Sequence, residues 1–164
     1  PSGVTPTVAA DGNGLVFGGA GSMAAGINGA LGADTTHHLF WHLTPTTVSA
    51  GDTLVGTSDG QLVIYLGATL QVYDGATRDS GAVVPAASAV LVECQLDATT
   101  GRGRFYLDGV LVGVEFDYTP RQLGAGDLQW GGNQLVGTMF AGLWVGGRLL
   151  SGAELLAVRR AMVA

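Results

Sequence analysis

The sequence predicts one all-β domain, and three observations support this prediction. Of the 164 residues, 47% are hydrophobic and 12% are charged, so the chain can bury a core large enough to order itself. Short apolar runs recur about every ten residues between Gly, Asp, Asn and Pro, as in strands joined by turns. Helix signals are confined to the C-terminal segment. This spacing is typical of a β-sandwich or a β-barrel.

The apolar runs are expected to form ten strands. In chain order they cover residues 14–17, 38–43, 53–57, 61–66, 69–73, 89–96, 104–107, 110–116, 127–130 and 138–145. Asp108-Gly109 predicts a hairpin, because this pair supplies the positive φ angles of a type I′ turn. A short helix is expected from Ser151 to Met162, since Ser151 and Glu154 have the spacing of a capping box.

Charge and hydropathy exclude two kinds of partner. Seven basic residues, all arginine, and thirteen acidic residues give a net charge of −6, so a cationic nucleic-acid surface is not expected. No apolar run reaches the roughly 18–20 residues of a membrane helix, which argues against membrane insertion. The N-terminus carries neither Met nor signal-peptide features, so residues 1–164 are expected to form a single domain of a larger protein.

Five segments occur in the order found in a known superfamily. They are LVFGG (15–19), LFWHLTP (39–45), QLVIYL with LQVY (61–66 and 70–73), FYLDGVLVG (105–113) and FAGLWVGGRLLSGAEL (140–155). Together they resemble the laminin-G-like branch of the concanavalin A-like lectin and glucanase superfamily. The resemblance implies an antiparallel jelly-roll β-sandwich with one concave sheet and a short C-terminal helix. It also implies recognition of sugars or proteins in an extracellular, cell-surface or virion setting.

A loop near the C-terminus is the first candidate for a ligand site. Sugar sites combine a flat aromatic ring with nearby polar groups on a supported backbone. Trp130 is followed by two glycines and then by Asn133 and Gln134, which would place a ring and two amides on one loop. The alternative is a Gly-rich turn between two strands. We rank this loop first among the predicted sites.

The second candidate is one face of the strand at residues 38–43. Alternation along a strand places His38, Phe40 and His42 on one face and a core-facing apolar stripe of Leu39, Trp41 and Leu43 on the other. The polar-aromatic face is either open to a ligand or covered by a neighbouring loop. His38 and His42 would lie about 13 Å apart at about 3.3 Å per residue, too far to share a metal ion.

Neither a metal nor a catalytic centre is assigned. Calcium could bind at acids in the predicted loops, which are Asp11, Asp52, Asp59, Asp74 and Asp79. Asp-Gly and Asn-Gly are also common in tight turns, and we favour a role in turns for these residues. Retaining glycosidases need two carboxyl groups about 5–5.5 Å apart. Only Glu115 and Asp117 share a strand at close spacing, and solvated carboxylates fit them better. Cys94, the single cysteine, is expected to be a buried, unreactive thiol.

The sequence therefore predicts a non-catalytic recognition or adhesion module. A glycan or cell-surface polysaccharide is the first-choice ligand. One alternative is a structural decoration or fibre module of a phage particle that contacts sister subunits. A second alternative is a glycoside hydrolase-like enzyme.

Overall fold

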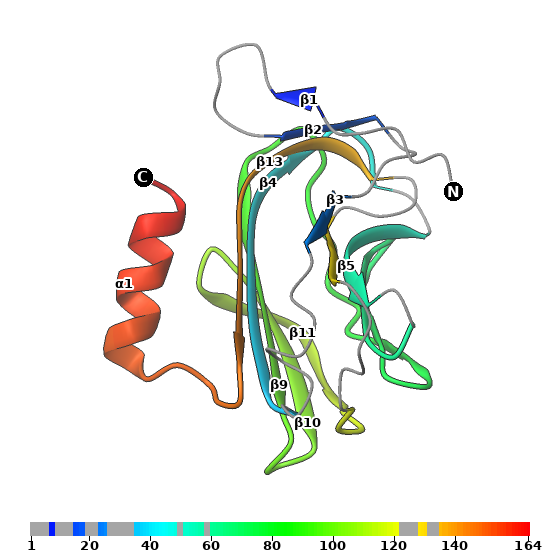
Figure 1. Cartoon of the computed structure of the whole chain (residues 1–164), viewed down its shortest axis with the longest axis vertical. Helices are drawn as coiled ribbons and strands as arrows, with labels where there is room; N and C mark the ends of the chain where they lie inside the picture. Colours follow the sequence, from blue (N-terminus) through cyan, green and yellow to red (C-terminus); the bar gives the residue numbers. More distant parts are fainter. Residues whose placement is uncertain are drawn as a thin grey trace.

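Two antiparallel sheets face each other in the computed structural model, which describes residues 7–8, 15–18, 23–25, 35–48, 51–57, 60–121, 128–130 and 135–164 (Figure 1). Among these residues, one sheet has seven strands in the order β1-β2-β13-β4-β9-β10-β11. The other has six strands in the order β3-β12-β5-β6-β7-β8. Every pairing is antiparallel, and strands distant in sequence lie side by side. The predicted jelly-roll β-sandwich is confirmed.

The strand bounds follow the apolar runs closely. The seven-stranded sheet contains β1 (Thr7–Val8), β2 (Leu15–Gly18), β4 (His37–Pro45), β9 (Val90–Asp97), β10 (Arg102–Leu107), β11 (Val110–Asp117) and β13 (Val136–Gly146). The six-stranded sheet contains β3 (Met23–Ala25), β5 (Asp52–Thr57), β6 (Val63–Leu66), β7 (Leu70–Tyr73), β8 (Thr77–Asp79) and β12 (Leu128–Trp130). Each of the ten predicted strands is present, whereas β1, β3 and β8 were not predicted.

The hairpin and the helix also agree with the prediction. Asp108 and Gly109 have φ angles of 50° and 83°, as the turn between β10 and β11 requires. Helix α1 (Gly152–Met162) has Ser151 as its N-cap and the complete capping box with Glu154. Arg148 donates two hydrogen bonds to Glu154, at 2.8 and 2.7 Å, and this pair together with the Ser151 contacts lowers the pKa of Glu154 to about 2.

Inward-facing side chains of both sheets form the core. Leu39, Trp41 and Leu43 of β4 are at most 1% exposed, which confirms the predicted stripe. Across the two layers, Trp41 and Trp130 meet with their ring centroids 6.3 Å apart. Cys94 is fully buried, and burial, followed by the nearby Glu93 charge, raises the pKa of its thiol well above the usual value. The prediction of a buried thiol is confirmed.

Helix α1 lies beside the seven-stranded sheet, on the side away from the six-stranded sheet (Figure 1). None of its residues is fully buried, and its half-exposed positions include Leu155, Val158, Arg159 and Met162. The helix therefore covers the outer face of this sheet without contributing to the core. Within the described ranges, no helix has the length and apolar character needed to cross a membrane.

Candidate functional site

The outer face of β4 is covered where it was predicted to bind a ligand. His38 and Phe40 are 0% exposed, and their rings stack with centroids 4.5 Å apart. The chain leading from β13 to α1 crosses this face, and the backbone N–H of Leu150 donates to His38 Nδ1 at 3.1 Å. His38 and Phe40 are therefore not open to a ligand. Of the two alternatives for this face, open to a ligand or covered by a neighbouring segment, the structure shows the covered one.

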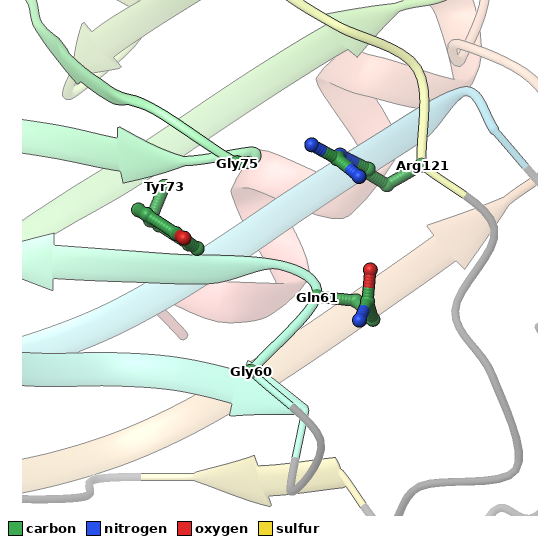
Figure 2. Close-up of a pocket in the computed structure, with 5 residues that line it drawn as sticks. All are labelled: Gly60, Gln61, Tyr73, Gly75 and Arg121. Carbon is green, nitrogen blue, oxygen red and sulfur yellow. The ribbon is translucent and has the colours of Figure 1, made fainter.

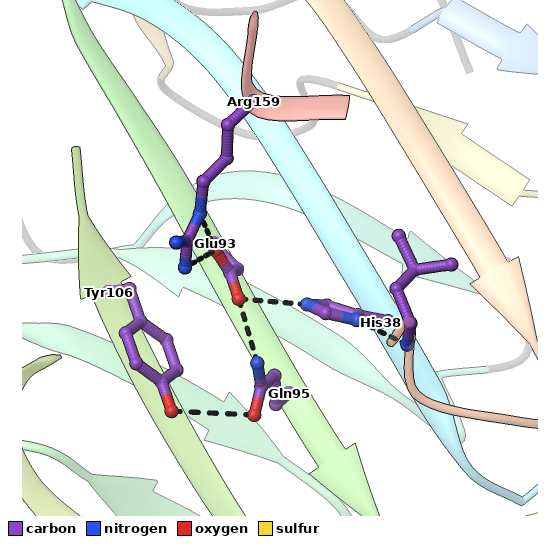
Figure 3. Close-up of polar contacts among 6 residues, drawn as sticks. His38, Glu93, Gln95, Tyr106 and Arg159 are labelled. Carbon is purple, nitrogen blue, oxygen red and sulfur yellow. Dashed lines mark hydrogen bonds and ion pairs between the residues drawn. The ribbon is translucent and has the colours of Figure 1, made fainter. Parts of the chain in front are cut away.

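A buried carboxylate organises this covered face. Figure 3 shows Glu93 of β9 between Arg159 on one side and His38 and Gln95 on the other. Arg159 donates from Nε at 3.0 Å and from Nη2 at 2.7 Å to one carboxylate oxygen. His38 Nε2 and Gln95 Nε2 contact the other oxygen at 2.9 and 2.8 Å. The Arg159 guanidinium also lies over the Tyr106 ring, 5.8 Å from its centroid.

These contacts assign the donor and acceptor roles of the His38 ring nitrogens and keep Glu93 ionised. A backbone N–H can only donate, so His38 Nδ1 accepts from Leu150, and the ring proton of a neutral His38 lies on Nε2 and is donated to Glu93. Burial by itself raises the pKa of Glu93, but the hydrogen bonds from His38, Arg159 and Gln95 outweigh it and hold the pKa below its usual value. Glu93 is thus an ionised structural group that the chain itself saturates.

One residue of the predicted polar-aromatic face of β4 remains accessible. His42 is half-buried, and its ring lies 5.0 Å from that of Phe140, which is 40% exposed. That His42 takes part in ligand binding remains a prediction.

The predicted Trp130 loop also differs from the expectation. Trp130 is 9% exposed and pairs with Val55 of β5, on the inward-facing side of the sheet. Its ring packs so closely on Gly142 that a Cβ at that glycine would lie 2.8 Å from it. Trp130 is a core residue and not an open stacking platform, because β12 turns it toward the opposite sheet. Asn133 and Gln134 lie outside the described residues.

An open hollow occurs instead at one end of the six-stranded sheet. It has a volume of about 310 Å³ and is lined by Gly60, Gln61, Tyr73, Gly75 and Arg121. Figure 2 shows the Tyr73 ring, the Gln61 amide and the Arg121 guanidinium around the same space. These residues come from the β5–β6 connection, the end of β7, the β7–β8 turn and the segment after β11. The volume lies at the lower end of the range of small-ligand sites, about 300–1,000 Å³.

The hollow is built on well-supported backbone. Thr57 Oγ1 accepts from the backbone N–H groups of Gln61 and Leu62, at 3.0 and 3.2 Å, which holds the β5–β6 connection. Arg121 is held by its own Nε, which donates to the carbonyl oxygen of Asp74, and by its backbone N–H, which donates to Tyr118 Oη. These contacts place the guanidinium at the hollow before any ligand binds.

Gly75 is required by this arrangement for two reasons. Its φ of 102° lies in the region that favours glycine. A Cβ at this position would also lie 1.6 Å from Arg121 Nη2, so the guanidinium rests directly on the β7–β8 turn. Any larger residue at position 75 must displace the Arg121 side chain.

The neighbouring carboxylate does not pair with Arg121. The side chain of Asp74 is buried, and its Oδ1 accepts from Arg78 Nε at 3.2 Å and from the Ala76 N–H at 3.3 Å. Its Oδ2 accepts from the Thr119 N–H at 2.6 Å. Asp74 therefore stabilises the backbone next to the hollow. Arg121 forms no ion pair in the part of the chain that the structure describes.

The outward face of β6 and β7 extends the hollow. Register places Tyr65 opposite Gln71 and Val63 opposite Tyr73, so these four side chains share the outer face of the sheet. Burial, and next the nearby Tyr73, raise the pKa of the Tyr65 hydroxyl, so it remains a neutral hydrogen-bonding group. This face adds a second ring and an amide beside the hollow.

The loop acids that were weighed as calcium ligands lie in different settings. Asp74 and Asp79 accept from the backbone N–H two residues further on, which is turn chemistry. Asp52 is buried, and Asp11 and Asp59 lie outside the described residues. In the described ranges, no three metal-ligating side chains come together.

The carboxylates weighed for catalysis are engaged with arginines. Arg104 pairs with Glu115, while Arg102 lies near Glu115 at 3.6 Å and pairs with Asp117. Both acids are exposed on the edge strand β11. The arrangement is that of a solvated ion-pair ladder.

Tyr73, Gln61 and Arg121 were not predicted as a site. The Asp74-Gly75 turn after Tyr73 was visible in the sequence, and a ring ending a strand at such a turn is the one local signal. Arg121 lies 48 positions beyond Tyr73, so only the fold brings the two residues together.

No protein-family model and no curated protein sequence matches the chain. Solved structures do match it. Domain 4 of AbnA, an extracellular GH43 arabinanase of Geobacillus stearothermophilus in complex with arabinotriose, aligns with a TM-score of 0.72 and 14% identity over 97% of this chain and 82% of that one. The CBM40 of the Ruminococcus gnavus IT-sialidase, bound to α2,3-sialyllactose, aligns with a TM-score of 0.64 and 16% identity over 90% and 96%. 

A heptameric SAP-like pentraxin of Limulus polyphemus aligns with a TM-score of 0.61 and 13% identity over 79% of this chain and 71% of that one. At such identities, the matches establish the fold. The chain has the β-sandwich of lectin-like and carbohydrate-binding domains.

Proposed function

We propose that the chain is a non-catalytic carbohydrate-binding module, and that the hollow at Tyr73, Gln61 and Arg121 is its ligand site. The observation that carries this proposal is the meeting of a ring, an amide and a guanidinium in one open, preorganised space. A sugar has apolar C–H faces that pack on a ring and hydroxyls that need paired donors and acceptors. This set of side chains offers both.

The solved structures support a glycan as the ligand. Two of the matching domains are described with arabinotriose and with α2,3-sialyllactose, respectively. Both belong to larger enzymes, and the first of these enzymes is extracellular. We accordingly place this chain as a single domain of a larger extracellular or surface protein, related to the laminin-G-like branch suggested by its five motifs.

The arrangement of the carboxylates supports binding without catalysis. Glu93 is buried and saturated, and Glu115 and Asp117 are held by arginines. A glycosidase needs one carboxyl group that can give a proton and another that can attack or activate water in the same cleft. The described lining of the hollow offers no such pair.

A glycan-binding assay tests the proposal. The purified chain is screened against a panel of acidic and neutral oligosaccharides, and hits are titrated by calorimetry. Tyr73→Ala should weaken binding by about tenfold or more, because the stacking ring is lost. Phe140→Ala removes a half-exposed ring on the other sheet and should leave the affinity unchanged. Equal losses in both variants, or binding to no saccharide, would overturn the proposal.

One observation favours the alternative of a structural assembly module. Val110, Leu111 and Val114 of the edge strand β11 are 54–66% exposed. Exposed apolar side chains at a sheet edge are a common basis for contacts between subunits. A concentration-dependent oligomer in analytical ultracentrifugation that Leu111→Glu abolishes would support this alternative, and a monomer at all concentrations would reject it.

A further inference from the structure

We propose that the hollow recognises its glycan through a carboxylate, so that the ligand is an acidic saccharide carrying a uronic or sialic acid. This inference rests on the proposed function, since it names the ligand class of that same site. It is carried by the placement and the electrostatics of Arg121.

The guanidinium of Arg121 is held in place, and no described carboxylate pairs with it. Its Nε is used by the Asp74 carbonyl, while its terminal nitrogens are at the hollow. In the part of the chain that the structure describes, Arg121 forms no ion pair, and the carboxylate of Asp74, whose carbonyl Arg121 contacts, is committed to Arg78 and to two backbone N–H groups. A ligand carboxylate could pair with this positive charge.

The geometry suits a carboxylate better than a hydroxyl. A guanidinium presents parallel N–H donors that match the two oxygens of a planar acid, and such charge-assisted bonds are about twice as strong as neutral ones. Anchoring at Nε and packing on Gly75 limit the rotation of the Arg121 side chain, so less entropy is lost when the donors are used.

The same molecule already binds a carboxylate with the same kinds of side chain. Under α1, Glu93 is held by Arg159, Gln95 and His38, with the Tyr106 ring packed against the guanidinium, and the first two of these kinds of side chain and the ring recur in the hollow. In the hollow, Arg121, Gln61 and Tyr73 repeat an arginine, an amide and a tyrosine without a described acid in the lining. The covered site shows that these kinds of side chain can hold a carboxylate. In the hollow, the carboxylate would belong to a bound ligand.

Calorimetry with charge-matched probe pairs tests the inference. The probes are trigalacturonic acid and its methyl ester, N-acetylneuraminic acid and its methyl ester, and neutral galactotriose. Each ester keeps the sugar and removes only the charge, and the two acids distinguish a uronate from a sialate. We expect at least one acid to bind about tenfold or more tightly than its ester.

Variants assign the effect to Arg121. Arg121→Gln should abolish the preference for the acid over its ester. Arg121→Lys should retain part of this preference, because an ammonium keeps the positive charge but lacks the paired N–H donors of a guanidinium. Arg160→Gln removes the same charge from an exposed position on α1 and should change nothing. Circular dichroism melting confirms that each variant is folded.

The outcomes separate the two proposals. Equal binding of acid and ester, or binding of galactotriose alone, would reject the proposal of an acidic ligand. It would not reject the proposal that the chain is a glycan-binding module. Acid binding that survives in Arg121→Gln overturns the assignment to this hollow. Failure of every saccharide, here and in the wider panel, overturns the module itself.

Discussion

The covered face of the seven-stranded sheet and the open hollow of the six-stranded sheet use similar side chains for different purposes. Arg159, Gln95 and Tyr106 surround Glu93 beneath α1. Arg121, Gln61 and Tyr73 surround an open space about 310 Å³ in volume. The first set is complete within the chain and fastens α1 to the sheet. The second has no described carboxylate at its centre and is open to solvent.

This difference teaches that residue types alone do not define a site. An arginine next to a ring and an amide is structural where a described acid of the chain pairs with it. Where the described residues place no acid beside it, we propose that it serves recognition. Accessibility and charge compensation decide between the two roles.

The largest expected effect comes from breaking the covered set. Glu93→Ala should lower the free energy of unfolding by about 3 kcal/mol, because it leaves a buried His38 donor and Arg159 without their acceptor. Glu115→Ala breaks an exposed ion pair and should cost less than about 1 kcal/mol. Urea unfolding of both variants measures the difference, and similar losses would show that the covered set is not structural.

The pH dependence of stability should come partly from Glu93. Its pKa is lower in the folded chain than the usual 4.5, so its contribution is full above that value and is lost as the pH falls through the folded value. Urea unfolding from about pH 7 to about pH 3 should therefore show stability falling with acidification. Glu93→Gln should fall less steeply. An unchanged slope in that variant would contradict the role given to the Glu93 charge.

A pair of glycine variants sharpens the comparison at the hollow. Gly75 and Gly81 both have positive φ angles, of 102° and 69°, so alanine at either position should cost about 1–2 kcal/mol in backbone strain. Only at Gly75 does the added Cβ collide with Arg121, whereas at Gly81 it meets open space. Binding of an acidic saccharide should be lost in Gly75→Ala and kept in Gly81→Ala. Equal binding by both would show that the position of Arg121 does not matter.

The smallest expected effect concerns the end of α1. Ser151→Ala removes the side chain that accepts from Glu154, and loss of such a cap typically costs about 1 kcal/mol. Amide exchange should quicken within α1 and remain unchanged in β13. Faster exchange throughout the sandwich would indicate that the helix is part of the cooperative core.

The sequence was sufficient for most of the fold. Alternation placed Leu39, Trp41 and Leu43 in the core, and the Asp108-Gly109 turn and the Ser151 capping box depend only on neighbouring residues. The strands β1, β3 and β8 were missed because they have only two or three residues, and β8 is polar throughout. Their pairing is set by adjacent strands and not by their own pattern.

The sites were harder to predict because they depend on long-range placement. His38 and Phe40 were assigned to the correct face of β4, but the cover of this face comes from Leu150 and α1, more than 100 positions away. Trp130 was taken for a loop ring, although pairing with β5 turns it into the core. The hollow joins Gln61, Tyr73 and Arg121 from three separate segments of the chain, and no local spacing indicates it.

One measurement tests the central claim most directly, namely mapping of a bound acidic saccharide by amide chemical-shift perturbation on the labelled chain. The account predicts shifts at Gly60, Gln61, Tyr73, Gly75 and Arg121, with β4 and β9 beneath α1 unaffected. Chemical-shift changes centred on His42 and Phe140, or along β11, with no changes at the residues of the hollow, would contradict this account.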